Sequence, residues 1–204
     1  MQVKLLTSIG RLQEDIRDTA KAAQITRGNA DKELSAVGEE ELLKNIIKLG
    51  HESVIEHIVL KYRIFGLSRA CLQELARHRL ISLTVESTRY TLRKNLNNEE
   101  WVKSFRDSLD EHKRVFLDFF VKYANEHPEM PNDELKYLIP EFWPTTLTLT
   151  VNARELRHII DLRTAPVALQ EFQDLAHAFF DVVPNEFKFL LEDCVHQIEP
   201  CDAD

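Results

Sequence analysis

The sequence predicts an α+β fold: a small mixed or antiparallel sheet flanked by helices, with a helical insertion at about residues 98–140. Three observations lead to this prediction. A few short segments have strand composition, and they alternate irregularly with helical segments. The middle of the chain shows helical periodicity alone. The 204 residues, 44% of them hydrophobic, suffice for one domain that includes this insertion, so we expect a single domain over residues 1–204.

The first quarter of the chain predicts a strand followed by two helices. Residues 3–9 have the composition of a short strand, and residues 11–23 have apolar side chains at helical spacing. A turn is expected at 28–31. A second helix is expected over 31–49, where Gly50 serves as the residue that ends it.

The next segments predict a strand, a helix and a loop. Residues 54–65 are rich in β-branched and aromatic side chains, which favour a strand. Residues 67–77 are expected to be helical and to place Cys71 in the core as a small hydrophobic side chain. The charged stretch that follows, up to residue 90, is expected to be a loop.

The middle of the chain predicts the helical insertion. Residues 98–126 form one long amphipathic pattern, which the pair His127-Pro128 ends. Residues 133–138 predict one or two further helical turns before Pro140.

The last third predicts a strand and two helices. Residues 145–151 alternate between polar and apolar side chains, as a half-buried strand does. Asn152 is a suitable N-cap for a helix that runs through residue 163. A final helix is expected over 167–182.

Charge and cysteine content limit the functional classes. The formal net charge of −8 opposes non-specific binding to nucleic acids or to anionic membranes. No apolar run has the length of a membrane span, and the N-terminus turns polar too early for a signal peptide. The cysteines Cys71, Cys194 and Cys201 have no CxxC spacing, which favours a reducing compartment, so we expect a cytoplasmic protein.

The glycines exclude two common nucleotide-binding motifs. The five glycines form neither GxGxxG nor a P-loop, the motifs in which backbone N–H groups approach a phosphate. If this chain binds a nucleotide, its side chains must hold the phosphate.

Residues 77–90, RHRLISLTVESTRY, are the most informative stretch. Three arginines so close together repel one another unless an anion lies between them, and arginine matches phosphate bidentately. The simpler interpretation is a charged helix end, with Arg77 and Arg79 paired to carboxylates such as Glu74 or Glu86.

The spacing within this stretch resembles the signature of flavin-dependent thymidylate synthases. The Arg-His-Arg triplet is followed by seven residues, a serine and, one residue later, Arg-Tyr. The resemblance implies reductive methylation of dUMP to dTMP, with FAD as cofactor and NADPH and methylenetetrahydrofolate as co-substrates. It also implies a homotetramer with shared active sites. From the net charge we expect neither nucleic acid nor a membrane as a partner.

The resemblance assigns roles within and beyond the signature. Family members often carry a glutamate where this chain has Val85, and here Glu86 adjoins the serine instead. The residues expected at the nucleotide are Glu74, Arg77, Glu86, Ser87, Thr88, Arg89, Lys136 and Arg163. The residues expected at the flavin within the signature are Arg77, His78 and Arg79.

Two further stretches contribute to the expected flavin site. Residues 50–58, GHESVIEHI, could suggest a metal site, but their spacing is not HExxH and we assign no metal. Residues 152–163 read alone could be a solvated charged helix face. By resemblance, these two stretches supply the flavin contacts His51, Ser53, Glu56, Asn152, Arg154 and His158.

The residues also favour one type of chemistry. No cysteine lies in the signature, which fits a mechanism without a cysteine adduct on the pyrimidine. The resemblance places Arg163 at the pyrimidine and Ser87 at the phosphate or sugar, and these two are the predicted catalytic residues. Arg163 would stabilise negative charge on the pyrimidine, and Ser87 would act as a ligand rather than a nucleophile. Two other classes remain open: a nucleotide or single-stranded nucleic-acid binding module that stacks bases on Tyr90, Trp101 and Trp143, and a helical interaction protein.

Overall fold

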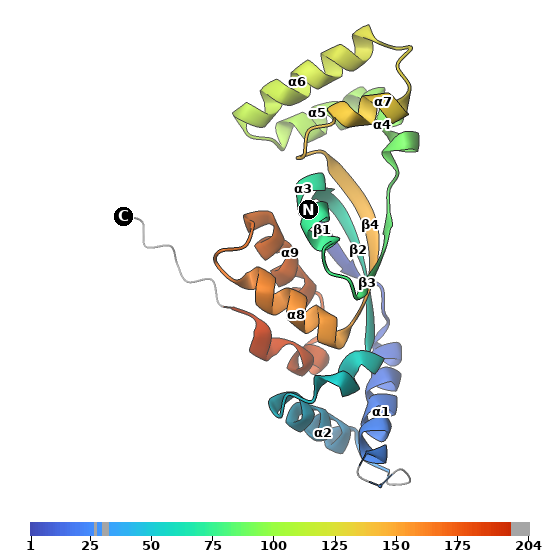
Figure 1. The fold of residues 1–204 in the computed structure, drawn as a ribbon, viewed down its shortest axis with the longest axis vertical. Coiled ribbons are helices and arrows are strands. Elements are labelled where there is room, and N and C mark those ends of the chain that lie inside the picture. Colours follow the sequence, from blue (N-terminus) through green and yellow to red (C-terminus); the bar gives the residue numbers. More distant parts are fainter. Residues whose placement is uncertain (27, 30–32, 197–204) are drawn as a thin grey trace, which may run out of the picture.

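The computed structural model describes residues 1–26, 28–29 and 33–196. Its described part contains one antiparallel sheet of four strands in the order β1-β2-β4-β3 (Figure 1). The strands are β1 (Gln2–Leu5), β2 (Val59–Ser68), β3 (Ile81–Val85) and β4 (Pro144–Asn152). The small antiparallel sheet with surrounding helices confirms the predicted α+β class.

The pair β2–β4 forms the centre of this sheet. The two strands are paired from Val59 opposite Asn152 to Ser68 opposite Pro144. A bulge interrupts the register at Gly66, whose φ of +72° is in the left-handed region. Alternate residues of β4 are buried, as expected for a strand with one face on the core.

Helices cover the sheet and extend it at one end. They are α1 (Ile9–Ile25), α2 (Ala36–Lys48), α8 (Ala153–Thr164) and α9 (Gln170–Asp181), followed by the 3₁₀ turns η3 (Asn185–Leu190) and η4 (Glu192–Cys194). In Figure 1, α8 and α9 lie beside the sheet, and α1 and α2 lie at the end opposite the insertion. Together with the strands they enclose the main apolar core.

The insertion lies at the other end of the sheet and has a separate apolar core (Figure 1). Its elements are α4 (Thr88–Leu96), α5 (Glu99–Asp107), α6 (Glu111–Glu126), α7 (Asn132–Leu135) and the 3₁₀ turn η2 (Lys136–Leu138). Leu92 and Leu96 of α4 belong to this core, so the helical part begins about ten residues before the expected residue 98. Arg93 closes the C-terminal end of α6 by donating to the carbonyls of Ala124, His127 and Met130 at 2.6, 2.6 and 3.0 Å. Whether the chain counts as one domain with an insertion stays a prediction.

Two predicted elements begin later than expected. The strand expected from residue 54 starts at Val59, because Glu52–His57 form a 3₁₀ helix, η1. Ile55 and Ile58 are both buried, and their spacing of three residues suits such a helix as well as a strand.

Helix α3 (Arg69–Leu75) begins two residues late, because Ser68 ends β2 and caps α3 by accepting from the Cys71 N–H at 3.0 Å. The burial of Cys71 in the core is confirmed.

Two further predictions about continuity were wrong. The stretch expected to be a loop after residue 77 contains β3, whose alternate residues pack on the core. The helix expected over 98–126 is divided, because the Asp110 carboxylate caps a new helix by accepting from the Lys113 N–H at 2.9 Å.

Another predicted helix begins five residues later than expected but ends where predicted. The helix expected over 31–49 begins at Ala36, capped by Ser35, while residues 31 and 32 and part of the turn at 28–31 lie outside the described residues. Gly50, at a φ of +73°, ends it as predicted, and the N–H groups of Gly50 and His51 donate to Ile47 and Ile46. Of the described helices, none is both long and apolar enough to cross a membrane.

Candidate active site

The two halves of the arginine-rich stretch lie at opposite ends of a strand. Of the seven residues between Arg79 and Ser87, five form β3, which at about 3.3 Å per residue spans roughly 17 Å. Because β3 is antiparallel to β4, Ile81 lies opposite Val151, beside the start of α8, and Val85 lies opposite Leu147 nearer the insertion. The sequence motif is therefore two sites joined by a strand.

A cavity lies beside the second half of the motif, at the start of α4. This α4 cavity has a volume of about 490 Å³. Ser87 occupies the N-cap position of α4, but its side chain makes no capping hydrogen bond. The lining residues are Arg69, Leu72, Val85, Glu86, Ser87, Thr88, Arg89, Lys136 and Tyr137.

The α4 cavity combines features that bind anions. The free N–H groups at the start of a nine-residue helix attract negative charge, and a hydroxyl and three cationic side chains surround them. Arg89 pairs with Asp133, with Nε–Oδ1 and Nη2–Oδ2 distances of 2.7 and 3.0 Å. Both side chains of that pair are more than half exposed, so the pair itself is weak.

The first half of the motif, with Arg77 and His78, belongs to a network of polar contacts that includes Arg163 of α8. Arg163 of α8 donates from Nη1 to Glu74 at 3.2 Å and from Nε to the His78 ring at 3.3 Å, and it lies over the ring of Phe172. Arg77 donates to the same Glu74 carboxylate at 3.0 and 3.1 Å. The pairing of Arg77 with Glu74 also matches the simpler interpretation of a charged helix end.

His78 is the buried centre of these contacts. Its Nδ1 lies 3.2 Å from the Glu155 carboxylate, and because a guanidinium can only donate, Nε2 accepts from Arg163 and Nδ1 carries the proton. Burial lowers the pKa of His78 below its ordinary value and the Arg163 charge adds to this, although Glu155 opposes both. The ring is therefore held neutral with a fixed tautomer.

A second cavity lies along α8. This α8 cavity, of about 580 Å³, contains Arg154 and His158 on the helix face that the spacing predicts. Asn152 caps α8 by accepting from the Glu155 N–H at 2.8 Å, as predicted. Arg154 donates to Glu56 of η1 at 2.6 Å, which joins two of the expected flavin contacts. The lining residues are Glu52, Leu80, Arg154, Glu155, Arg157, His158, Asp161, Asp193 and Cys194.

The remaining expected flavin contacts are not brought to the α8 cavity. His51 and Ser53 line a third cavity of about 340 Å³, between η1 and the ends of α1 and α2. Arg79 is exposed at the turn before β3. Glu86 and Val85 both line the α4 cavity, so a carboxylate is present there despite the departure from the family pattern. In the described part of the chain, no three metal-ligating side chains converge.

Sequence reasoning missed several residues of these walls. Arg69 and Tyr137 belong to the α4 cavity, and Arg157 and Asp193 to the α8 cavity. The sequence around Arg69 contains no motif that could have indicated its role. Tyr137, which is 80% exposed, adjoins Lys136, and Lys136 was expected at the nucleotide, so that position was the signal that could have indicated Tyr137.

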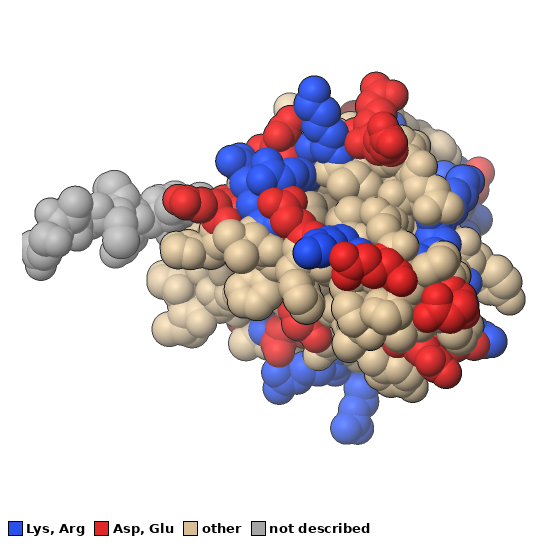
Figure 2. Space-filling model, turned by 90° about the horizontal axis from the view of Figure 1, so that it is seen from above, with Lys and Arg blue, Asp and Glu red and all other residues tan. Residues whose placement is uncertain are grey.

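The insertion end of the molecule carries no uniform basic surface. Figure 2 views the molecule from this end and shows Lys and Arg side chains interspersed with Asp and Glu around uncharged surface. This face gives no support to the alternative of a nucleic-acid binding module, which needs a basic patch.

Acidification should destabilise the protein through His78. Its folded-state pKa lies below that of the unfolded chain, so its contribution to stability is complete above about pH 6.5 and is lost as the pH falls below that value. We expect the unfolding free energy of wild type to fall between about pH 7.5 and about pH 5.5 more steeply than that of His78→Gln. The difference in slope should be at most about 1.4 kcal/mol per pH unit, and urea titrations at each pH measure it. The control His112→Gln changes an exposed ring on α6 and should keep the wild-type dependence. Identical pH profiles for wild type and His78→Gln would contradict this assignment.

Comparison with known proteins identifies the family. Residues 6–187 match the family model described as thymidylate synthase complementing protein. The flavin-dependent thymidylate synthase of Helicobacter pylori strain J99 is 41% identical over 160 residues, covering 71% of this chain and 76% of that protein. The enzyme of the same name from Campylobacter jejuni strain RM1221 is 39% identical over 188 residues, covering 83% and 84%.

A solved structure agrees over nearly the whole fold. The crystal structure of thymidylate synthase X from Helicobacter pylori with FAD and dUMP superposes with a TM-score of 0.82 at 32% identity, covering 97% of this chain and 100% of that one. The family model spans most of the chain and the relatives exceed 30% identity, which confirms the resemblance inferred from the arginine-rich motif. This chain belongs to the family of flavin-dependent thymidylate synthases.

Proposed function

We propose that this chain is a subunit of an enzyme that methylates dUMP reductively to dTMP, with FAD as cofactor and NADPH and methylenetetrahydrofolate as co-substrates. The observation that carries the proposal is the α4 cavity, where a serine hydroxyl, a helix N-terminus and three cationic side chains converge. A nucleoside monophosphate is the substrate whose charge this arrangement matches. The relatives that match the chain carry the corresponding name.

The α4 cavity would hold the phosphate and sugar of dUMP. Ser87 has a hydroxyl free to donate, and the Thr88 and Arg89 N–H groups begin the helix. Arg89, Lys136 and the newly found Arg69 add charge around the same space. The Glu86 carboxylate lines the same cavity, but among the described residues no hydrogen bond joins it to the Ser87 hydroxyl, which supports the role of Ser87 as a ligand rather than a nucleophile.

Arg163 would act on the pyrimidine. Its side chain is 14% exposed, and its guanidinium is fixed by Glu74 and His78, so it is oriented before a substrate binds. A preorganised cation beside O2 or O4 stabilises the negative charge that develops when C5 attacks a one-carbon unit. His78 stays neutral and accepts from Arg163, so it orients the arginine without adding a competing positive charge.

The residues along α8 fit a flavin nucleotide. Arg154 and His158 supply positive charge or hydrogen-bond donors for a pyrophosphate, and Glu56 and Asn152 supply acceptors for adenine or ribose. Bound FAD supplies the hydride chemistry that no side chain of the protein can supply. The protein itself would bind FAD and dUMP and hold them in the relative orientation that the reaction needs.

The separation of the cavities supports a homotetramer with shared active sites. His51 and Ser53 line one cavity, Arg154 another, and Ser87 a third. Large apolar side chains beside them are exposed in the single chain, including Leu80 at 61% and Tyr137 at 80%. Subunits packed against these surfaces would cover them and bring complementary residues to each site.

Spectroscopy and a coupled assay test the proposed function. The purified protein should bind FAD and show oxidised-flavin absorption, and with dUMP and methylenetetrahydrofolate it should form dTMP as it oxidises NADPH. A folded protein that neither binds FAD nor forms dTMP would refute the proposal. NADPH oxidation without dTMP would leave a flavin oxidoreductase of another kind.

Arg69 should bind the phosphate specifically. We expect Arg69→Gln to raise the dissociation constant of dUMP about ten- to a hundredfold, because a charge-assisted contact contributes roughly 1.5–3 kcal/mol. Its affinity for deoxyuridine, which lacks the phosphate, should stay as in wild type; calorimetry measures both. Arg63→Gln, an exposed β2 arginine outside the α4 cavity, is the matched control. Equal losses for both ligands would show that Arg69 supports the fold instead.

Mixed tetramers should test site sharing. If sites combine residues of different subunits, reassembly of Arg154→Ala with Arg89→Ala subunits yields some sites with neither lesion. These sites should restore NADPH oxidation coupled to dTMP formation, to a fraction of the wild-type rate. Mixed tetramers that form but stay as inactive as the parents would place both clusters in one chain's site.

A further inference from the structure

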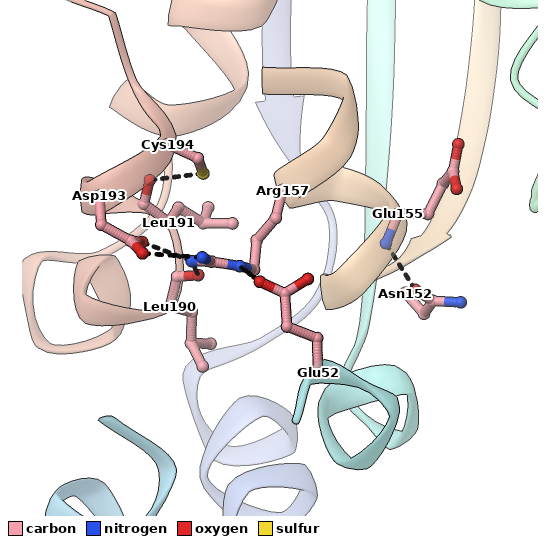
Figure 3. A network of polar contacts seen from close by, with 8 residues as sticks. All are labelled: Glu52, Asn152, Glu155, Arg157, Leu190, Leu191, Asp193 and Cys194. Atoms are coloured by element: carbon pink, nitrogen blue, oxygen red, sulfur yellow. Dashed lines mark hydrogen bonds and ion pairs between the residues drawn. The ribbon is translucent and has the colours of Figure 1, made fainter. Parts of the chain in front are cut away.

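A buried arginine joins three segments that are far apart in the sequence (Figure 3). Arg157 of α8 donates from Nε to Glu52 of η1 at 3.0 Å and from Nη1 to the Leu190 carbonyl at 2.7 Å. Its Nη1 and Nη2 atoms form a bidentate pair with Asp193, at 2.5 and 2.8 Å. The guanidinium thus ties the C-terminal segment to the turn that carries the expected flavin contacts.

The environment of Arg157 makes these contacts strong. Only 8% of its side chain is exposed. Burial alone would lower the pKa of Arg157, but the hydrogen bonds to Asp193 and Glu52 raise it above its ordinary value, so the charge persists. The same contact lowers the pKa of Asp193. Removing one partner of such a pair leaves the buried charge undercompensated.

The geometry around Glu52 connects this cluster to the expected flavin contacts. Glu52 lies between His51 and Ser53 in the chain, and Glu56 follows one turn later. Arg154 and Arg157 are one turn apart on α8 and bind Glu56 and Glu52 respectively. The buried pair of Arg157 with Glu52 therefore positions η1 relative to α8, and so positions the exposed pair of Arg154 with Glu56.

The C-terminal segment also forms part of the cavity wall. Asp193 and Cys194 line the α8 cavity together with Arg154 and His158. The segment has no motif of its own. Arg157 is its buried charged anchor to α8, and His196 adds an exposed contact to Asp161 at 3.2 Å.

We propose that Arg157 is a positioning residue for flavin binding, which fixes η1 through Glu52 and makes residues 190–194 part of the flavin site through Asp193 and the Leu190 carbonyl. This inference rests on the proposed function. Arg157 itself need not touch the cofactor. Its effect reaches the flavin through the placement of Glu56, Arg154 and the cavity wall.

Two variants test the proposal, with a control of the same geometry. Asp193→Asn weakens the bidentate pair at a half-exposed position, and Arg157→Lys keeps the charge but loses the planar fork. Asp118→Asn is the control, because Asp118 forms a bidentate pair with Arg106 at 2.7 and 2.8 Å, is 50% exposed, and lies in the insertion. FAD affinity is measured by fluorescence quenching during reconstitution of the apoprotein, and dUMP affinity by calorimetry, at a temperature where every variant is folded.

We expect Asp193→Asn and Arg157→Lys to weaken FAD binding about tenfold or more, with dUMP affinity unchanged, and Asp118→Asn to change neither. A purely structural role would reduce both affinities together. Wild-type FAD affinity in the two folded variants, or an equal loss in the Asp118→Asn control, would overturn the inference while leaving the proposed function intact. A wild-type protein that binds no FAD would overturn the proposed function, and this inference with it.

Discussion

The long antiparallel pairing of β2 with β4 is the constraint on which the rest of the structure depends. At one end, Val59 lies opposite Asn152, so η1 leads into β2 just where β4 continues into α8. At the other end, Ser68 lies opposite Pro144, so β2 leads into α3 where the insertion returns to the sheet. One ladder thus carries the α8 cavity at one end and the α4 cavity at the other. Leu80 lines the α8 cavity and Val85 lines the α4 cavity, so about five residues of strand, or roughly 17 Å, separate their nearest walls.

The arginines divide into groups with different freedom. Arg77, Arg89 and Arg154 pair with carboxylates at exposed positions, where solvent screens such pairs and an incoming phosphate can replace or share the partner. Arg157 and Arg163 are largely buried, and their partners fix their orientation. The sequence argument that clustered guanidiniums require an anion between them was therefore incomplete. Carboxylates of the chain itself supply much of the compensation.

The fold was predictable where a pattern had one physical meaning. The alternation over 145–151 and the Asn152 cap gave β4 and α8 with errors of one residue or less, because only a half-buried strand and a capped helix explain them. Ile55 and Ile58, in contrast, suit either a strand or a 3₁₀ turn, and β3 is a five-residue strand within a charged motif. In both places tertiary packing decides between local alternatives.

The sequence suggested candidate site residues but not their arrangement in space. The motif suggested Ser87 and Arg89, and the 152–163 stretch suggested Arg163, yet Arg69 and Asp193 reach the cavities from segments whose sequences carry no signal. Their placement follows from contacts over long sequence separations: the Arg69 N–H donates to the Trp143 carbonyl at 3.1 Å, and Asp193 binds Arg157. Such contacts exist only once the sheet has formed.

The insertion illustrates how this placement serves the site. Lys136 reaches the α4 cavity from η2, and Asn132 of the preceding α7 donates to the Arg89 carbonyl at 2.7 Å. The separate core of the insertion and the carbonyl contacts of Arg93 hold α6 and the turn after it in place, and so determine where α7 and η2 lie. Two distant supports therefore act alike: Arg93 orients the insertion toward the α4 cavity, and Arg157 orients η1 toward the α8 cavity. In both cases a single guanidinium satisfies several acceptors at once: Arg93 binds three carbonyls at the end of α6 and in the turn after it, and Arg157 binds acceptors on η1 and on the C-terminal segment.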